Sequence, residues 1–215
     1  MSSSFAESKG KIIVESLIQT IAENKVYLSE LDGAIGDGDH GINMDKGFGK
    51  AQKELSGKDV GLSESLQILG RILVDEIGGS MGPLYGTLFR RMARASKGET
   101  EIDALVIEKM LVSGLEGVQG LGNAQVGDKT LIDTLFPAVE AFRSCNKEGK
   151  PLNQCLDSLV EAAQKGKDST IDMVAKVGRA SRLGERSRGV LDPGATSCYL
   201  LLQSFAQAVQ ELIKE

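Results

Sequence analysis

Apolar residues recur at the spacing of an α-helix through most of this 215-residue chain, and the alternating pattern of strands is nearly absent. Near the N-terminus, Ile12, Ile13, Leu17, Ile18 and Ile21 mark one face of a helix. The same periodicity predicts eight helices, over residues 6–30, 41–55, 63–78, 82–97, 102–119, 129–145, 152–176 and 194–214, to within a few residues. An all-α fold is therefore expected.

The four prolines refine these boundaries. Pro83, Pro151 and Pro193 fall near expected helix starts, where the missing N–H of proline costs least. Asp192 should cap the last helix, with Pro193 as its first residue. Pro137 falls inside the sixth expected helix and should kink or break it.

Short connections between eight helices imply antiparallel neighbours, either in a bundle or in a closed up-and-down barrel. No linker or low-complexity stretch divides the chain, so residues 1–215 are expected to form a single domain. The glycines gather in segments 33–41, 78–86, 114–127 and 178–194. These segments are alternate connections, so they should all meet at one end of the molecule.

The bulk properties exclude several classes of protein. A net charge of −5 gives no electrostatic support for binding nucleic acid or an anionic membrane. The three cysteines lack metal-binding spacing, which is typical of reduced thiols. No window resembles a signal peptide or a membrane span, so a cytoplasmic protein is expected.

The first glycine-rich segment is also acidic, because Asp32, Asp37 and Asp39 fall within eight residues. Carboxylate oxygens are the ligands that Mg²⁺ and Ca²⁺ prefer. The alternative is a turn in which aspartates cap the helix that starts near Gly41. The interleaved glycines, with His40 nearby, favour a metal site.

Three well-known motifs are matched only in part. Segment 36–41 satisfies G-x-G-x-x-G, but no strand precedes it and its carboxylates would face a pyrophosphate. An EF-hand starting at Asp37 fails because Gly41 and Phe48 occupy ligand positions. Segment 122–130 resembles a P-loop, but Asp128 intervenes before Lys129 and again no strand precedes it. Asp128 or Thr130 is expected to cap the following helix instead.

The remaining glycine-rich segments suit phosphate. Segment 78–83 leads into a helix, so its N–H groups could cradle an anion, although a flexible turn is the alternative. Segment 178–189 holds four arginines, whose planar fork suits phosphate, although a solvated basic loop is the alternative. With the aspartates, these loops indicate phosphoryl transfer. His40 is expected to hydrogen-bond a phosphate or to cap its helix.

These motifs together resemble the nucleotide-binding (L) subunit family of dihydroxyacetone kinases. The resemblance covers nearly the whole chain and is carried by segments 31–41, 78–86, 127–130 and 178–194. It implies an eight-helix barrel with a nucleotide at one end, and two Mg²⁺ ions held by Asp32, Asp37 and Asp39. The nucleotide contacts that it implies are His40, Gly41, Ile42, Asn43, Ser80, Met81, Gly82, Gly122, Leu131, Arg179, Asp192, Pro193 and Gly194.

The resemblance also implies partners. In this family a separate K subunit or domain holds the ketose through a covalent histidine link. Either ATP is an exchangeable substrate, or ADP stays bound and is rephosphorylated by a phosphohistidine protein of the phosphoenolpyruvate-dependent phosphotransferase system; the second is the expectation for a separate L subunit. The chain departs from the family pattern at Met81, Asn123, Leu131 and Arg182. Met81 and Arg182, expected at the mouth of the site, leave the ketose open between dihydroxyacetone and a longer one such as erythrulose.

Two readings from other classes remain at this point. A nucleotide-loaded regulatory module would bind a transcription factor or another kinase. A purely structural helical bundle would carry no nucleotide.

Overall fold

Eight α-helices make up most of residues 4–214, the part of the chain that the computed structural model describes. The all-α prediction is confirmed. The helices are α1 (Lys11–Ile35), α2 (His40–Leu55), α3 (Leu62–Glu76), α4 (Met81–Ser96), α5 (Ala104–Gln119), α6 (Ile132–Lys147), α7 (Leu152–Ser169) and α8 (Pro193–Leu212). Three short 3₁₀ segments accompany them, η1 (Glu7–Lys9), η2 (Thr170–Asp172) and η3 (Arg179–Ser187).

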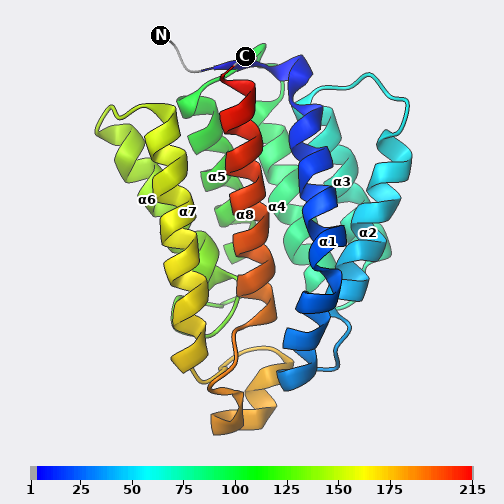
Figure 1. The fold of residues 1–215 in the computed structure, drawn as a ribbon, viewed down its shortest axis with the longest axis vertical. Coiled ribbons are helices and arrows are strands. Elements are labelled where there is room, and N and C mark those ends of the chain that lie inside the picture. The colour runs from blue at the N-terminus through cyan, green and yellow to red at the C-terminus, as the bar shows by residue number, and fades with distance from the viewer. Residues whose placement is uncertain (1–3, 215) are drawn as a thin grey trace.

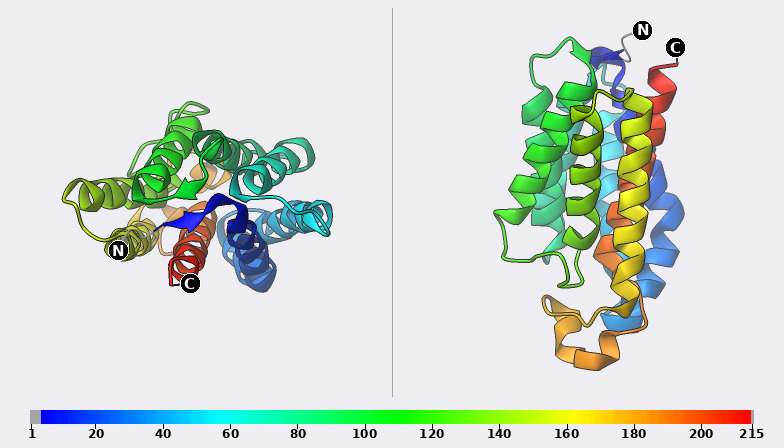
Figure 2. Two further views of the ribbon diagram at one scale, coloured as in Figure 1. Left: turned by 90° about the horizontal axis from the view of Figure 1, so that it is seen from above. Right: turned by 90° about the vertical axis from the view of Figure 1, so that its left-hand side faces the viewer.

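The helices run alternately up and down along one long axis (Figure 1). Each helix packs against the next one along the chain, and α8 packs against α1 as well as against α7. Figure 2 shows the same order from above and from the side. This ring of contacts agrees with the expected up-and-down order, while the closed barrel itself stays a prediction.

A small sheet ties together the end of the molecule that carries both termini (Figure 1). Strand β1 (Phe5–Ala6) pairs antiparallel with β2 (Glu101–Ile102), with Phe5 opposite Ile102. Both of these facing side chains are buried in the core. The expected first helix, 6–30, is therefore wrong at its start, because this pairing draws residues 5 and 6 into an extended conformation.

The expected end of the first helix is also wrong, since α1 continues to Ile35. Ile35 lies two helical turns beyond Leu28, and both side chains are buried, so burial of Ile35 extends the helix through Gly33. As a result Asp32 lies on the last turn of α1 rather than in a loop. Ile12, expected on the apolar face, is 47% exposed.

Two further boundaries differ from expectation. Helix α7 stops at Ser169, not at residue 176, because polar side chains take its last carbonyls: Ser169 Oγ donates to Gly166 O and Thr170 Oγ1 to Lys167 O. Helix α6 continues through Pro137, so the predicted break is wrong.

The cap predicted for the last helix is confirmed. Asp192 Oδ2 accepts a hydrogen bond from Ala195 N at 2.7 Å, and Pro193 is the first residue of α8. Within residues 4–214, no helix combines the length and the apolar character that crossing a membrane would require.

Candidate functional site

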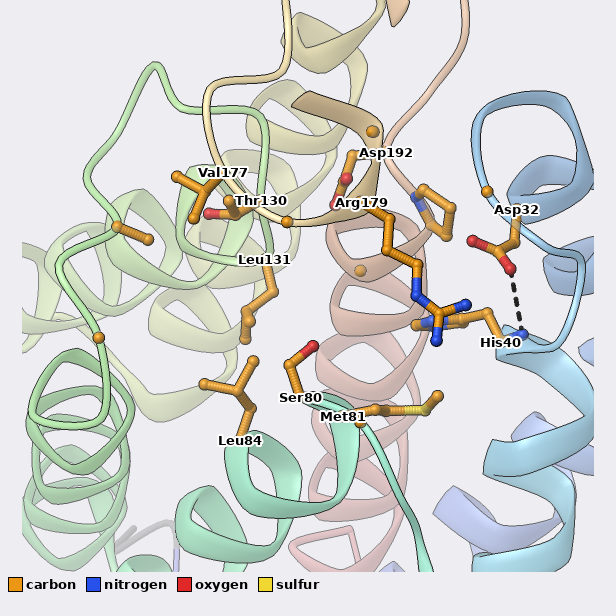
Figure 3. Close-up of a pocket in the computed structure, with 18 of the residues that line it drawn as sticks. Asp32, His40, Ser80, Met81, Leu84, Thr130, Leu131, Val177, Arg179 and Asp192 are labelled. Carbon is orange, nitrogen blue, oxygen red and sulfur yellow. Dashed lines mark hydrogen bonds between the residues drawn. The ribbon is translucent and has the colours of Figure 1, made fainter. Parts of the chain in front are cut away.

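The four glycine-rich connections meet around one cavity of about 670 Å³. They are the α1–α2, α3–α4, α5–α6 and α7–α8 connections, and each contributes to the wall. The prediction that these four segments share one end of the molecule is confirmed. Figure 3 shows the cavity between them.

The helix starts give this cavity a positive electrostatic bias. In an up-and-down order, α2, α4, α6 and α8 all begin at this end, and the first residue of each lines the wall: His40, Met81, Ile132 and Pro193. A helix N-terminus carries unsatisfied N–H groups and a partial positive charge. Four such ends around one cavity favour an anionic ligand.

The acidic cluster lies on one side of this cavity. Carboxylate oxygens of Asp32, Asp37 and Asp39 lie within 4.8 Å of one another. The turn is shaped by the chain itself, because Asp32 Oδ2 accepts from Asp39 N at 3.0 Å and Gly38 has a φ of 79°. Three carboxylates this close repel one another unless cations intervene, and oxygen-only ligands suit Mg²⁺. The donor set therefore fits the metal that the sequence predicts.

Only one of the four arginines in the last connection reaches the cavity. Arg179 lines its wall, where its side chain extends toward His40 and Asp32 (Figure 3). Its guanidinium forms an ion pair with Asp37. Arg188 instead pairs with Glu185 and donates to the carbonyl of Asp172. Of the four arginines, the cavity wall therefore contains a single guanidinium rather than a patch of four.

His40 is held by a buried hydrogen-bond network beneath the cavity. Its Nε2 lies 2.9 Å from Ser197 Oγ, and Tyr85 OH lies 2.7 Å from the same oxygen. Tyr85 OH also donates to Gly194 O at 3.1 Å. Burial lowers the pKa of His40 to about 4, against the opposing effect of Asp32. The side chain does not cap its own helix, since it points to α8.

The opposite side of the cavity is apolar. Leu84, Leu131 and Val177 lie together on this side, away from Asp32 and Arg179 (Figure 3). Leu121 also lines the wall and is 51% exposed. A cavity with one apolar side and one charged side matches a molecule that has a flat apolar ring at one end and phosphates at the other.

The third connection is folded by Asp133 rather than by Asp128. Asp133 is buried and accepts from Gly127 N and from Thr130 N, at 2.5 and 2.7 Å. Of the two residues expected to cap α6, Asp128 does not do so, because its Oδ2 accepts from Gln125 N within the turn. Thr130 Oγ1 does accept from Ile132 N at 3.2 Å, at the first residue of α6.

Most residues predicted for the site line this cavity. They are Asp32, Asp37, Asp39, His40, Asn43, Ser80, Met81, Gly122, Leu131, Arg179, Asp192, Pro193 and Gly194. Three others are not part of the wall. Gly41 packs against α1, Gly82 packs against the carbonyl of Ile77, and Ile42 is exposed on α2. Their roles, like those of the lining residues, stay predictions.

The departures from the family pattern have different positions. Met81, Asn123 and Leu131 line the cavity, so they alter its shape directly. Arg182 is exposed and is not part of the wall.

Two residues were missed by the sequence reasoning. Ser197 supports His40 from α8, 157 positions away, and Lys129 is buried with its ammonium among backbone carbonyls. No local signal reveals Ser197. For Lys129, the one local signal is the partial P-loop pattern of segment 122–130. The sequence contains only a weak indication of the apolar side of the cavity: Leu121 and Val177 are apolar residues within otherwise polar loops.

Comparisons with known proteins agree with this arrangement. Residues 34–207 match the DAK2 domain. The chain is 43% identical, over 88% of its length and 90% of the relative, to PEP-dependent dihydroxyacetone kinase 1, ADP-binding subunit DhaL, from Listeria innocua. It is 40% identical, over 86% and 89%, to the ADP-binding subunit DhaL of the PEP-dependent dihydroxyacetone kinase of Escherichia coli.

A solved structure is also similar. The dihydroxyacetone kinase from C. freundii in complex with AMP-PNP and Mg²⁺ superposes with a TM-score of 0.68 at 25% identity. The match covers 92% of this chain, which spans about a third of that kinase.

Proposed function

Because this chain belongs to the DAK2 domain family, we propose that it is the nucleotide-binding subunit of a dihydroxyacetone kinase. It holds ADP or ATP together with magnesium, and it transfers the terminal phosphoryl group to a short ketose carried by a separate K subunit. The relatives named as ADP-binding subunits, which match this chain over nine-tenths of their length, support this proposal.

The single observation that carries the proposal is the two-sided cavity at the converging helix starts. Leu84, Leu131 and Val177 would hold the adenine ring, and the N-terminus of α4 at Ser80 and Met81 would face phosphate oxygens. Arg179 lies on the charged side, where its guanidinium can stabilise the charge that develops on the transferred group. The hydrogen bond to Ser197 orients His40 at the edge of the phosphate side.

Asp32, Asp37 and Asp39 would hold the magnesium, and we propose two ions for this cluster. When bound, magnesium offsets the charge of the phosphates and polarises their oxygens. The chain itself orients Asp32 for this role, because Asp32 Oδ2 accepts a hydrogen bond from the N–H of Asp39. In the structure Arg179 is the cation that faces Asp37.

The ketose should come from a partner. His40 is the only histidine in this sequence, and its Nε2 is engaged with Ser197. The covalent histidine link to the ketose must then be made by the K subunit. We further propose that ADP stays bound and is rephosphorylated by a phosphohistidine protein, because both subunit relatives are named PEP-dependent.

The test combines the chain with a K subunit of this family and a panel of ketoses. Phosphoryl groups are supplied either as ATP or as phosphoenolpyruvate with the phosphotransferase proteins. We expect dihydroxyacetone phosphate from phosphoenolpyruvate, and a rate at least about a hundredfold lower with Asp37→Asn, because a metal-holding carboxylate is lost. The control is Asp45→Asn, which removes a carboxylate paired with Lys25 outside the cavity and should leave the rate unchanged.

Each outcome has a distinct meaning. Transfer to no ketose from either source would contradict the proposed function. A full rate with Asp37→Asn would contradict the metal assignment alone. Transfer to erythrulose only would replace the proposed ketose, and transfer from ATP only would replace the proposed donor. Neither result would contradict the assignment as a kinase subunit.

A further inference from the structure

The connection between α7 and α8 forms a loop with a closed neck. We call residues 170–190 the arginine loop, because it presents Arg179 to the cavity. Its two ends are joined by hydrogen bonds that backbone N–H groups donate. Gly189 N donates to Ile171 O at 2.7 Å, and Ala175 N donates to Ser187 Oγ at 2.9 Å. The neck thus brings the two ends together before the chain enters α8.

Lys129 enters this neck from a different connection. Its Nζ donates to four carbonyl oxygens, those of Thr170, Met173, Ser187 and Val190, at 2.7, 3.2, 2.7 and 2.6 Å. Two of these carbonyls belong to the outgoing end of the arginine loop and two to the returning end. One ammonium group therefore bridges both ends of the loop.

This arrangement is costly, so it calls for an explanation. Lys129 is 1% exposed, and within residues 4–214 no carboxylate forms an ion pair with it. Its φ of 61° makes it the one non-glycine residue of the described chain in the left-handed region. A buried charge and a strained backbone both oppose folding, and such positions cluster at functional sites.

Lys129 lines the cavity, but its ammonium group is directed into the neck of the arginine loop rather than toward the phosphate side. An ammonium group has three N–H donors, and here carbonyl oxygens of the neck surround it. The partial P-loop pattern of the sequence therefore marks a different role. What Lys129 can influence is the loop, and through the loop the position of Arg179.

We propose that Lys129 is a positioning residue that closes the neck of the arginine loop and thereby holds Arg179 against the phosphate side of the cavity. This inference rests on the proposed function, since it assigns Lys129 a part in retaining the nucleotide. The adjacent residues Thr130 and Leu131 line the cavity, so one short segment contributes to the wall and also fastens the loop opposite.

A purely structural role makes a different prediction from a positioning role. If Lys129 served only the fold, Lys129→Met would lower the stability of all the helices. Its effect on ADP affinity would then add to the effect of removing Arg179. If Lys129 acts through Arg179, its removal should matter little once Arg179 is gone. A double-mutant cycle separates the two.

The experiment measures Mg²⁺-dependent ADP affinity for the whole chain and for Lys129→Met, Arg179→Gln and the double variant. We expect each single change to weaken ADP binding about tenfold, and the double variant to be within about twofold of Arg179→Gln. Lys129→Arg should recover most of the affinity, because it keeps a charged donor. The matched control is Lys176→Met, since Lys176 joins the same two connections through an exposed pair with Asp128 and should change little.

Amide hydrogen exchange gives an independent readout. In Lys129→Met, exchange should rise in residues 173–190 while α3 and α4 keep their protection. Uniform loss of protection, additive effects in the cycle, or unchanged ADP affinity in Lys129→Met would each overturn the proposal. If Lys129→Met does not fold, Ser187→Ala serves instead, because it opens the same neck by removing the acceptor of Ala175 N. Additive effects of Ser187→Ala and Arg179→Gln on ADP affinity would then overturn the proposal. Absence of ADP binding to the unmodified chain would instead reject the proposed function.

Discussion

At the scale of single residues, Asp192 combines a helix cap with a place in the cavity wall. Its carboxylate accepts from Ala195 N, and burial raises its pKa to about 7. The nearby charge of Asp133 raises it further, while hydrogen bonding to Ala195 and the charge of Lys129 oppose the shift. Ionising Asp192 in the folded chain is therefore unfavourable, although the ionised carboxylate caps α8.

This cost predicts how stability depends on pH. The pKa of Asp192 is about 7 in the folded chain, above its ordinary value of 3.8, so the folded state binds the proton more tightly. The contribution of Asp192 to the free energy of unfolding falls as pH rises from about 4 to about 7, by about 4 kcal/mol in total. Asp192→Asn keeps a capping oxygen and removes the charge.

Urea unfolding of both proteins without ligand, at pH 5, 6.5 and 8, measures this effect. The stability advantage of Asp192→Asn should grow with pH and level off above 7. An advantage that stays constant or shrinks with rising pH would show that Asp192 is not held as described.

At the scale of elements, two glycines of α2 form a matched pair. A Cβ at Gly41 would lie 2.0 Å from the carbonyl oxygen of Lys25 on α1, whereas a Cβ at Gly49 would meet nothing within 4 Å. Gly41→Ala must push α2 away from α1 beside the acidic turn, and should destabilise the chain by about 1–3 kcal/mol. Gly49→Ala should stabilise it by up to about 1 kcal/mol through helix propensity.

Thermal unfolding distinguishes the two variants directly. The melting temperature should fall for Gly41→Ala and rise for Gly49→Ala, and only the first should also weaken Mg²⁺-dependent ADP binding. Shifts in the same direction would contradict the close approach of α1 and α2 at Gly41.

The elements also show where sequence reasoning ends. Their number, order and periodicity follow from local pattern, and the cap at Asp192 follows from its Pro193-Gly194 neighbours. The start of α1 does not, because Phe5 is buried by pairing with Ile102, far along the chain. The path of the chain after α7 does not either, because Lys129, from another connection, takes the carbonyls of Thr170 and Met173.

At the scale of the whole molecule, the order of the helices is what assembles the site. Alternating direction places four connections and four helix starts at one end, so the gathering of the glycine-rich segments could be predicted without knowing any side-chain contact. The contacts that fix the site could not, because Lys129 and Ser197 reach their partners across 41 or more positions. The sequence therefore predicts which segments meet, and the structure adds how they are fastened.

The central claim is that this end of the molecule binds one nucleotide through magnesium. Calorimetric titration of the purified chain with ADP, once with Mg²⁺ and once with EDTA, tests it most directly. We predict one ADP per chain in Mg²⁺ and an affinity at least about tenfold lower in EDTA, because the three carboxylates then repel the phosphates. No binding in Mg²⁺, or equal affinity in both conditions, would contradict the account.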